Sequence, residues 1–341
     1  MRILLTADPM LPVPPTLYGG IERIVAGLAE ELRLRGIEVG LIAHRDSRAP
    51  VDRLFAWTTT EARGVKAGAR NSYTLLQAVW AFRPHLVHSF SRLGYLLPIL
   101  AFRVPKLMSY QRLTGGRQIS LAAALGGSTL RFSGCSEFIA AMGRRWGGKW
   151  LAIPNFVDTN QFRYVPAVAD KAPLVFLGRI ERIKGAHLAI AIAKLAGREL
   201  IIAGNRSREG AEADYWEREI APELGRNGIS YVGPVDDKQK IELLGQALAL
   251  VAPIEWDEPF GIVFVEALAC GTPVISRPRG AAPEIVRDGF EGFLVPDLAA
   301  GCKAVREIGL ISRSACRRRA VEEYSRAVVV DRYLEAYEEL L

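Results

Sequence analysis

Apolar residues along the chain alternate between short continuous runs and stretches with helical periodicity. The first run, residues 3–7, is typical of a buried strand and is followed by a proline-rich loop that ends at Gly19 and Gly20. Between residues 21 and 32 the apolar positions recur at intervals of three and four, which predicts an amphipathic helix that Gly36 ends. The next run, residues 37–43, completes a strand–helix–strand unit, which indicates a parallel sheet.

The same alternation continues through the second half of the chain. Further strand-like runs lie at residues 86–90, 106–110, 131–134, 150–153, 173–177, 200–203, 229–232, 248–252, 273–276 and 292–295. A polar stretch at residues 158–170 interrupts the pattern, and a chain of 341 residues is expected to form roughly two domains. We therefore predict two Rossmann-like, doubly wound parallel-sheet domains, residues 1–155 and 160–318, with a hinge near residues 154–165.

This architecture also predicts where a ligand would bind. In doubly wound sheets, ligands bind beyond the carboxyl ends of the strands. Two such domains facing each other would place that edge of each sheet in a shared cleft. A last helical stretch, about residues 320–341, is expected to cross back onto the first domain.

Composition excludes several classes of protein. The chain is 50% hydrophobic and 24% charged, close to the globular average, which excludes a disordered, collagen-like or coiled-coil chain. No apolar stretch of about 18 residues runs unbroken, so no membrane-spanning helix is expected. The first residues lack the features of a signal peptide, and the four cysteines form no CxxC pair. We therefore expect a cytoplasmic protein with reduced thiols.

Charge is unevenly distributed between the two halves. Residues 1–155 carry 20 Lys and Arg against 9 Asp and Glu, whereas the remainder carries 24 against 28. A basic half can attract nucleic acid, an anionic membrane or an anionic substrate, or it can simply be the soluble surface of a protein from an arginine-rich host. Because aromatic residues are not interleaved with the basic ones, we do not expect nucleic acid as a partner.

The segment from residue 255 to residue 275 contains the most informative candidates. It follows the predicted strand at 248–252, and Pro259 suits the start of a helix that Gly271 and Pro273 would end. Glu258 would then lie at or just before the helix N-terminus and Glu266 about two turns along the same helix. The amides of Gly261, Ile262 and Val263 would favour an anion, and a carboxylate such as Glu266 can accept two hydrogen bonds from a sugar diol. Taken singly, Glu258 is also compatible with a capping role and Glu266 with an ordinary surface position.

Two cations precede this segment. Arg179 and Lys184 follow a predicted strand and lie five residues apart in a strand-to-helix connection. Together they can neutralise a diphosphate leaving group without a metal ion, although each alone is typical of a solvated surface. Gly19 and Gly20 let the backbone come close to a phosphate or sugar, or they simply form a loop.

In combination, these features resemble the retaining glycosyltransferases of family 4, which have the GT-B fold. Glu258 and Glu266 match the Glu-x7-Glu motif of that family. Further similarities, in chain order, are the glycine pair Gly19-Gly20, the hinge at residues 153–158, Gly178-Arg179, Lys184-Gly185, Gly271-Thr272-Pro273-Val274 and residues 280–284. The resemblance covers nearly the whole chain.

The resemblance implies a function and a set of roles. Arg179 and Lys184 would hold the diphosphate of a UDP- or GDP-sugar, Glu266 its ribose, and Glu258 the hydroxyls of the transferred hexosyl group. The amides at Gly261, Ile262 and Val263 would face the sugar and phosphate, and Gly19 and Gly20 would line the donor cleft from the first domain. No cofactor or metal ion would be needed, since the donor is itself a substrate.

The chain departs from the family pattern at a few positions. Phe156 stands in the hinge where glycine is usual, and Gln111 takes a position that is often histidine. Of two histidines expected after a first-domain strand, His88 is present but the second position holds Phe90. His88 could therefore contact the sugar or lie in the core or a loop.

Other functions remain open from the sequence. A nucleotide-sugar epimerase of the same fold and a non-catalytic nucleotide-sugar-binding protein are the alternatives, whereas the absence of GxGxxG after the first strand disfavours a dehydrogenase. Asp257 and the pair Asp236-Asp237 resemble fragments of a metal-binding DxD motif, but we interpret the pair as a helix cap before Gln239.

The acceptor is expected to approach through the basic half of the chain. There the segment Arg144-Arg145-Trp146-Gly147-Gly148-Lys149-Trp150 places two tryptophans next to three cationic residues. This cluster predicts an anionic or lipid-linked acceptor, with peripheral contact to an anionic membrane at its cytoplasmic face. In the competing interpretation, Trp150 begins a buried strand and the basic residues are merely solvated.

Overall fold

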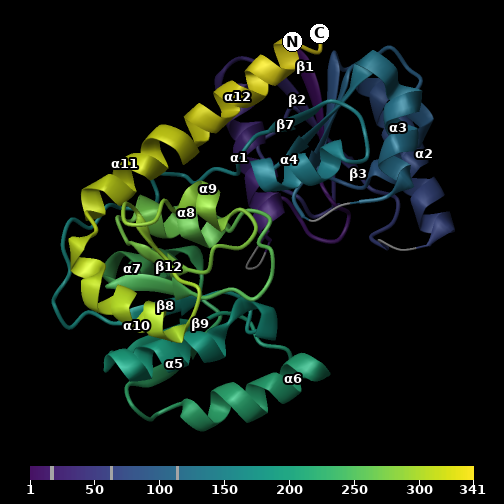
Figure 1. Ribbon diagram of the computed structural model, residues 1–341. Helices are drawn as coiled ribbons and strands as arrows, with labels where there is room; N and C mark the ends of the chain where they lie inside the picture. Colours follow the sequence, from purple (N-terminus) through teal and green to yellow (C-terminus); the bar gives the residue numbers. More distant parts are fainter. Residues whose placement is uncertain (16–18, 62–63, 113–114) are drawn as a thin grey trace. The chain divides into compact units, whose positions relative to one another are not determined.

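The computed structural model describes residues 1–15, 19–61, 64–112 and 115–341, which form two compact units (Figure 1). Unit 1 comprises Met1–Asn155 together with Arg326–Leu341, and unit 2 comprises Phe156–Ser325. Unit 1 is therefore built from two separate segments of the chain, with the whole of unit 2 between them in sequence. Each unit contains one parallel β-sheet with helices packed on it.

The sheet of unit 1 has the strand order β3-β2-β1-β4-β5-β6-β7, and its neighbouring strands are all parallel. Its strands are β1 (Arg2–Thr6), β2 (Glu38–Ala43), β3 (Arg53–Ala56), β4 (Leu86–Ser89), β5 (Lys106–Tyr110), β6 (Leu130–Gly134) and β7 (Trp150–Ala152). Chain order reverses between β1 and β4, which makes this pair the topological switch point of a doubly wound sheet.

Helices cover both faces of this sheet. They are α1 (Gly20–Leu34), α2 (Val65–Phe82), α3 (Arg117–Gly126), α4 (Glu137–Arg144) and α12 (Arg326–Glu338), with the short 3-10 helices η1 (Leu93–Ile99) and η2 (Gly127–Thr129). Residues of α2, η1 and α3 share one apolar cluster with Leu4 and Val87 of the sheet. Tyr333 and Tyr337 of α12 instead contact His88, which points to the opposite face because successive strand residues alternate.

The helix predicted from the apolar period at residues 21–32 is confirmed as α1. Its buried apolar residues Ile24, Val25, Leu28, Ala29 and Leu32 form a single stripe, as the intervals of three and four require. Ion pairs between its outer residues and α12, Arg35 with Asp331 and Glu30 with Arg326, fasten the two helices together.

The sheet of unit 2 has the order β10-β9-β8-β11-β12-β13, again parallel, with its switch point between β8 and β11. Its strands are β8 (Leu174–Leu177), β9 (Leu200–Ala203), β10 (Ile229–Gly233), β11 (Ala249–Ala252), β12 (Val274–Ser276) and β13 (Gly292–Leu294). Its helices are α5 (Ala186–Ala196), α6 (Ala211–Tyr215), α7 (Asp237–Gln246), α8 (Ile262–Ala269), α9 (Ala282–Ile285), α10 (Leu298–Glu307) and α11 (Arg313–Tyr324). Shorter helical turns are η3 (Arg182–Lys184), η4 (Trp216–Ile220), η5 (Ala221–Glu223) and η6 (Ile308–Leu310).

Every strand predicted from the sequence is present, with its ends within one residue of the prediction. The prediction missed β3, an edge strand that pairs with β2 alone and whose residues are mostly exposed. Among the described residues, no helix is both long enough and apolar enough to cross a membrane.

Candidate functional site

The charged residues predicted for the second domain lie beyond the carboxyl ends of β8 and β11, the strands of the unit 2 switch point. Arg179 follows β8, and Lys184 ends η3 just before α5. Glu258 lies in the loop that joins β11 to α8. Open parallel sheets bind ligands at such a point because the connections on its two sides run to opposite faces and leave room between them.

A glycine allows the loops after β8 and β11 to approach each other. Gly185 has a φ of +79°, and a Cβ atom there would lie 2.3 Å from the carbonyl oxygen of Pro253. The amide of Glu255 donates to the carbonyl of Ile183 at 2.8 Å, which joins the two loops directly. Any larger residue at position 185 would therefore force η3 away from the loop that carries Glu258.

Lys184 and Glu258 form an ion pair at the centre of this arrangement. The Lys184 Nζ atom lies 2.7 Å from Glu258 Oε2, and the Trp256 Nε1–H donates to the same oxygen at 2.8 Å. The ammonium also lies 4.4 Å from the centroid of the Trp256 ring. Since the two charged side chains are 18% and 12% exposed, solvent screens their attraction less than at an open surface. Trp256 was not among the residues predicted from the sequence, where its place two residues before Glu258 was the only signal for it.

Arg179 lies on the same loop as Lys184. Its guanidinium pairs with Glu181, and the Ile180 amide donates to the Asn205 carbonyl at 2.8 Å. The loop after β8 is thereby tied to the loop after β9. The structure thus places both predicted cations at one edge of the sheet.

The helix expected to begin at Pro259 begins three residues later, so that prediction is wrong. Gly261 precedes α8 with a φ of +87°, a left-handed conformation that helical residues do not adopt. Glu258 consequently lies outside the helix, and its carbonyl accepts a hydrogen bond from the Ala281 amide at 2.8 Å. Of the two carboxylates, only Glu266 lies on α8. Glu258 and Glu266 are therefore not two turns apart on one helix.

The N-terminus of α8 leaves amides available to an anion. The Phe264 amide donates to the Gly261 carbonyl at 2.9 Å, whereas the hydrogen bonds of the described residues include none donated by the amides of Ile262 or Val263. Unpaired amides and the helix dipole together favour negative charge at this end.

Glu266 is buried, which excludes the interpretation that it is an ordinary surface residue. Its carboxylate is 11% exposed and pairs with Lys240 of α7, whose Nζ atom also lies 5.2 Å from the Phe162 ring centroid. Lys240 lies one turn after Asp236, which caps α7 through a reciprocal capping box with Gln239, as predicted. Lys240 was not among the residues predicted from the sequence, although it lies in the first turn of the helix that Asp236 was predicted to cap.

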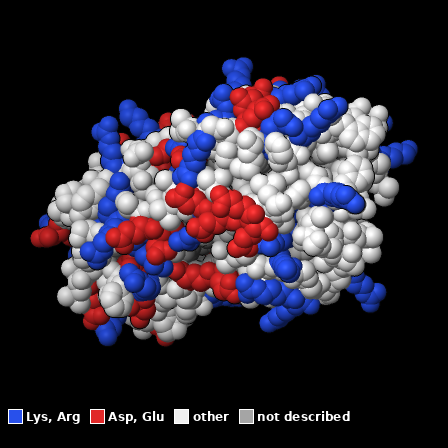
Figure 2. Space-filling model, turned by 90° about the horizontal axis from the view of Figure 1, so that it is seen from above, with Lys and Arg blue, Asp and Glu red and all other residues white. Residues whose placement is uncertain are grey.

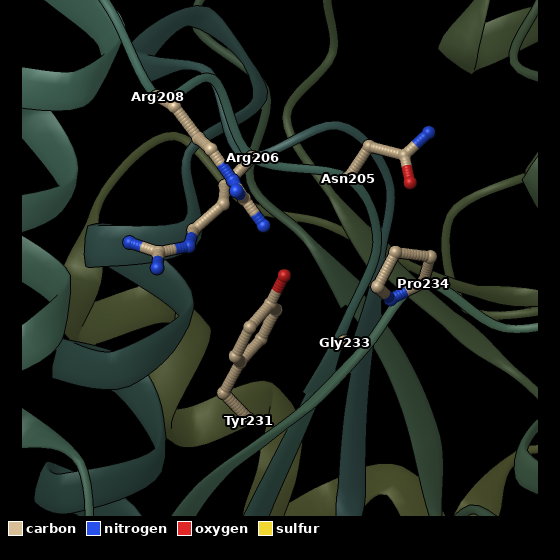
Figure 3. Close-up of a pocket in the computed structure, with 6 residues that line it drawn as sticks. All are labelled: Asn205, Arg206, Arg208, Tyr231, Gly233 and Pro234. Carbon is tan, nitrogen blue, oxygen red and sulfur yellow. The ribbon is translucent and has the colours of Figure 1, made fainter.

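A cavity of about 320 Å³ opens beside these loops, at the carboxyl ends of β9 and β10 (Figure 3). Its lining consists of Asn205, Arg206, Arg208, Tyr231, Gly233 and Pro234. The Tyr231 hydroxyl donates to the Gly204 carbonyl at 2.8 Å, and the Arg206 guanidinium lies 4.5 Å from the centroid of the Trp216 ring. The backbone of Arg206 pairs with Ile180, next to Arg179. In the sequence, Arg206 and Arg208 closely follow the strand predicted at residues 200–203. They were the signal for this cavity, but they were not among the predicted site residues.

The glycines predicted to contact the donor lie in unit 1. Gly19 precedes α1 with a φ of +147°, and Gly20 is the first residue of the helix. A Cβ atom on Gly19 would lie 2.9 Å from Oε2 of Glu22. Burial raises the pKa of Glu22, a carboxyl group that the sequence analysis did not select.

His88 lies in the core of unit 1 and not at a sugar-binding surface. It is fully buried, and its Nδ1 and Nε2 atoms lie 2.6 Å from the hydroxyls of Tyr337 and Ser109. Burial lowers the pKa of His88 to about 3. With both ring nitrogens engaged and the ring of Phe90 packed 4.3 Å from its own, His88 has no free atom for a ligand.

Of the two interpretations of the basic cluster, the one in which Trp150 begins a buried strand is confirmed. Trp150 begins β7, is 6% exposed and stacks on Phe132, while its Nε1–H donates to the Gly147 carbonyl at 2.9 Å. Arg144 in the same segment pairs with Glu137. Trp146, Arg145 and Lys149 remain at the surface.

Within the described part of the chain, no three His, Cys, Asp or Glu side chains gather as a metal site would require. Asp257, which resembles part of a metal-binding motif, pairs with a side chain instead: the Arg279 Nε atom lies 3.3 Å from its Oδ1 atom.

Comparison with known proteins identifies relatives of both units. The family described as Glycosyltransferase Family 4 matches residues 18–161, and the family described as Glycosyl transferases group 1 matches residues 158–327. A D-inositol 3-phosphate glycosyltransferase of Mycolicibacterium paratuberculosis is 38% identical over 127 residues, which is 37% of this chain and 29% of that protein. The matched part thus spans less than a third of that relative's length.

Solved structures resemble the whole chain. Sucrose-phosphate synthase from Thermosynechococcus elongatus has a TM-score of 0.81 at 20% identity, covering 99% of this chain and 98% of that one. AviGT4, a glycosyltransferase of avilamycin A biosynthesis, has a TM-score of 0.73 at 24% identity, with coverages of 99% and 97%. Anabaena HepE, solved with UDP-glucose, has a TM-score of 0.75 at 19% identity and 99% coverage of both chains. With its two parallel sheets the chain has the predicted GT-B fold, and it belongs to glycosyltransferase family 4.

Proposed function

We propose that this glycosyltransferase moves a hexosyl group from a nucleotide-diphosphate sugar to its acceptor, with retention of configuration and without a metal ion. The observation that carries the proposal is the Lys184–Glu258 ion pair at the switch point of unit 2. It holds an ammonium and a carboxylate side by side where a doubly wound sheet binds its ligand.

The cations around this pair suit a departing nucleoside diphosphate. Lys184 has three donor hydrogens, so it can bind a phosphate oxygen while it remains paired with Glu258. Arg179 and the amides of Ile262 and Val263 add positive charge at the same sheet edge. Preorganised donors of this kind stabilise the charge that develops on a leaving group, which is the work that a metal ion performs elsewhere.

The carboxylates suit the two sugars of the donor. Glu266 lies inside α8, remote from Glu258, and its second oxygen can accept hydrogen bonds from ribose hydroxyls while Lys240 balances its charge. Glu258, next to Lys184, would contact the hydroxyls of the transferred hexosyl group. Gly19 and Gly20 of unit 1 would admit the donor close to the backbone.

The cavity at β9 and β10 suits the nucleoside. Neighbouring strands lie about 5 Å apart, so the cavity is within reach of a nucleotide whose phosphates lie beyond β8. Tyr231, which packs against the buried Trp216 ring, offers aromatic surface, and Arg206 can stack on a base. HepE, which shares the fold, was solved with UDP-glucose, so a UDP-sugar is the first donor to test.

The acceptor is proposed to be anionic or lipid-linked and to approach through the basic half, unit 1, with the enzyme in the cytoplasm. The excess of basic residues in residues 1–155 supports an anionic acceptor.

The direct test measures binding and turnover of UDP- and GDP-sugars in the presence of EDTA. Binding raises the midpoint of thermal unfolding by mass action, and single-turnover hydrolysis then reports chemistry. Donor binding with hydrolysis or transfer supports the proposal. Binding without turnover would indicate a nucleotide-sugar-binding protein, epimerised sugar would indicate an epimerase, and a strict requirement for Mg²⁺ or Mn²⁺ would contradict metal independence.

A further inference from the structure

A long segment of unit 1 has basic residues but no acidic ones. Residues 62–136 contain ten Lys and Arg and no Asp or Glu, although the average acidic content of the chain would place about eight there. Within the described parts of the chain, this segment forms the helices α2, η1, α3 and η2 of unit 1 and the strands β4, β5 and β6. The helical layer formed by α2, η1 and α3 therefore carries no carboxylate.

The layer has two unlike sides. Its inner side packs on the sheet through Leu75, Val79, Leu96 and Ile119. Its outer side exposes large apolar side chains, which we call the outer α2–α3 face: Tyr73 (59% exposed), Trp80 (65%), Leu97 (56%), Phe102 (38%), Leu121 (58%) and Leu125 (52%). Exposed apolar side chains that gather in one patch with a polar rim are typical of an interaction surface.

Hydrogen bonds hold two elements of this face, α2 and η1, in place. The Ser72 hydroxyl of α2 donates to the Gly94 carbonyl of η1 at 3.2 Å. The buried Lys106 ammonium donates to the carbonyls of Ile99, Leu100 and Phe102 at 2.7–3.0 Å, which fixes the end of η1. These elements of the outer α2–α3 face therefore hold defined positions on unit 1.

Cations border the apolar side chains. Lys66, Arg70, Arg103 and Arg117 are exposed, and the salt bridges of the described residues include none of them. The turn that bears Arg145, Trp146 and Lys149 adjoins α3, because the Ser120 hydroxyl donates to the Trp146 carbonyl at 2.6 Å. At the right of the view in Figure 2, blue side chains likewise stand among white ones with no red beside them.

We propose that the outer α2–α3 face docks on an anionic lipid membrane. Tryptophan and tyrosine favour the membrane interface, leucine and phenylalanine enter the acyl boundary, and unpaired Lys and Arg attract anionic headgroups. A second copy of the chain is a poor occupant, since it would bring like charges together. Nucleic acid would leave the exposed leucines without apolar contact. The inference rests on the proposed function only for the purpose of docking, which is to bring the enzyme to a lipid-linked acceptor.

The test is vesicle co-sedimentation of the full chain, with phosphatidylcholine vesicles that contain or lack phosphatidylglycerol. We expect binding to the anionic vesicles alone, weakened by salt. Each cation near an anionic surface contributes a factor of about five to the partition coefficient, so Arg103→Glu/Arg117→Glu should lower it by roughly 25-fold or more. Trp80→Ser/Leu121→Ser should lower it roughly tenfold through the lost apolar contact.

Matched variants in unit 2 serve as controls. Arg218→Glu/Arg226→Glu reverses two exposed charges, and Leu195→Ser/Leu310→Ser removes two exposed leucines (63% and 78%). Both controls should bind vesicles as the wild type does, and all variants should keep the thermal unfolding midpoint of the wild type.

Three outcomes would overturn the proposal: no binding to anionic vesicles at low salt, equal loss of binding in the controls, or retention by nucleic acid in place of vesicles. Titration with UDP and with GDP separates this inference from the proposed function. Vesicle binding without binding of either nucleotide would refute the proposed function alone, and nucleotide binding without vesicle binding would refute the docking surface alone.

Discussion

Replacement of Lys184 by alanine tests the centre of the proposed site. The Lys184 Nζ atom lies 2.7 Å from Glu258 Oε2, and the two side chains are 18% and 12% exposed. A hydrogen bond to a charged group contributes about 1.5–3 kcal/mol, so loss of the ammonium should weaken binding of a nucleoside diphosphate by roughly 10- to 150-fold.

The same change should also affect stability. Without Lys184, the mostly buried Glu258 carboxylate keeps the Trp256 Nε1–H as a donor but loses its counter-charge. An incompletely satisfied buried acceptor costs about 1–3 kcal/mol of the free energy of unfolding. Lys194, whose Nζ atom lies 2.7 Å from Glu223, provides the matched control because both side chains of that pair are about one-third exposed. Exposed pairs of this geometry contribute about 0–1 kcal/mol.

The assay is isothermal titration with UDP and with GDP, accompanied by thermal unfolding of each variant. Lys184→Ala should bind the preferred nucleotide one to two orders of magnitude more weakly, whereas Lys194→Ala should bind it as the wild type does. Lys184→Arg keeps the charge and should recover part of the affinity even if the alanine variant is destabilised. Equal affinity in Lys184→Ala and the wild type, or an equal loss in Lys194→Ala, would refute the assignment of Lys184 to the phosphates.

Three further predictions address the carboxylates, the metal and the core. Glu266→Gln should weaken donor binding about tenfold, whereas Glu258→Gln should lower kcat more than affinity; steady-state kinetics that are unchanged in both would remove these residues from the site. Activity should survive EDTA, and its loss on chelation with recovery on added Mg²⁺ would show that Lys184 and Arg179 do not suffice. Because the folded-state pKa of His88, about 3, is below its unfolded value of 6.5, the unfolded chain takes up a proton first as pH falls. The stability contributed by neutral His88 is therefore complete above pH 6.5 and declines below it, by about 1.4 kcal/mol per pH unit, until pH reaches about 3. In urea denaturation across this pH range, the free energy of unfolding should depend less steeply on pH in His88→Gln than in the wild type. Identical slopes in the two proteins would contradict the prediction.

The strands were predictable because burial in a parallel sheet imposes apolar runs. Twelve such runs in the sequence match strands of the structure. β3 could not be found this way, since Arg53–Ala56 lies at the edge of the sheet and is largely exposed. Backbone pairing with β2, which no side-chain pattern records, makes it a strand.

The candidate site was predictable in its residues but not in its contacts. Lys184 and Glu258 were both selected, yet their pairing joins positions 74 residues apart and depends on the sheet order. The start of α8 was misplaced because Pro259 is compatible with a helix, whereas the left-handed Gly261 prevents one there. Lys240 was missed because its partner, Glu266, lies on another helix.

The division of unit 1 into two segments has a consequence for biosynthesis. Tyr333 and Tyr337 are buried in unit 1 against β4, but they emerge from the ribosome only after all of unit 2 has been translated. Unit 2 is continuous in sequence, so it can fold while synthesis is still under way. The nascent first segment must meanwhile keep the face around His88 uncovered. The part of the protein that is made first is thus the part that is finished last, and its apolar surface around His88 is open to aggregation until then.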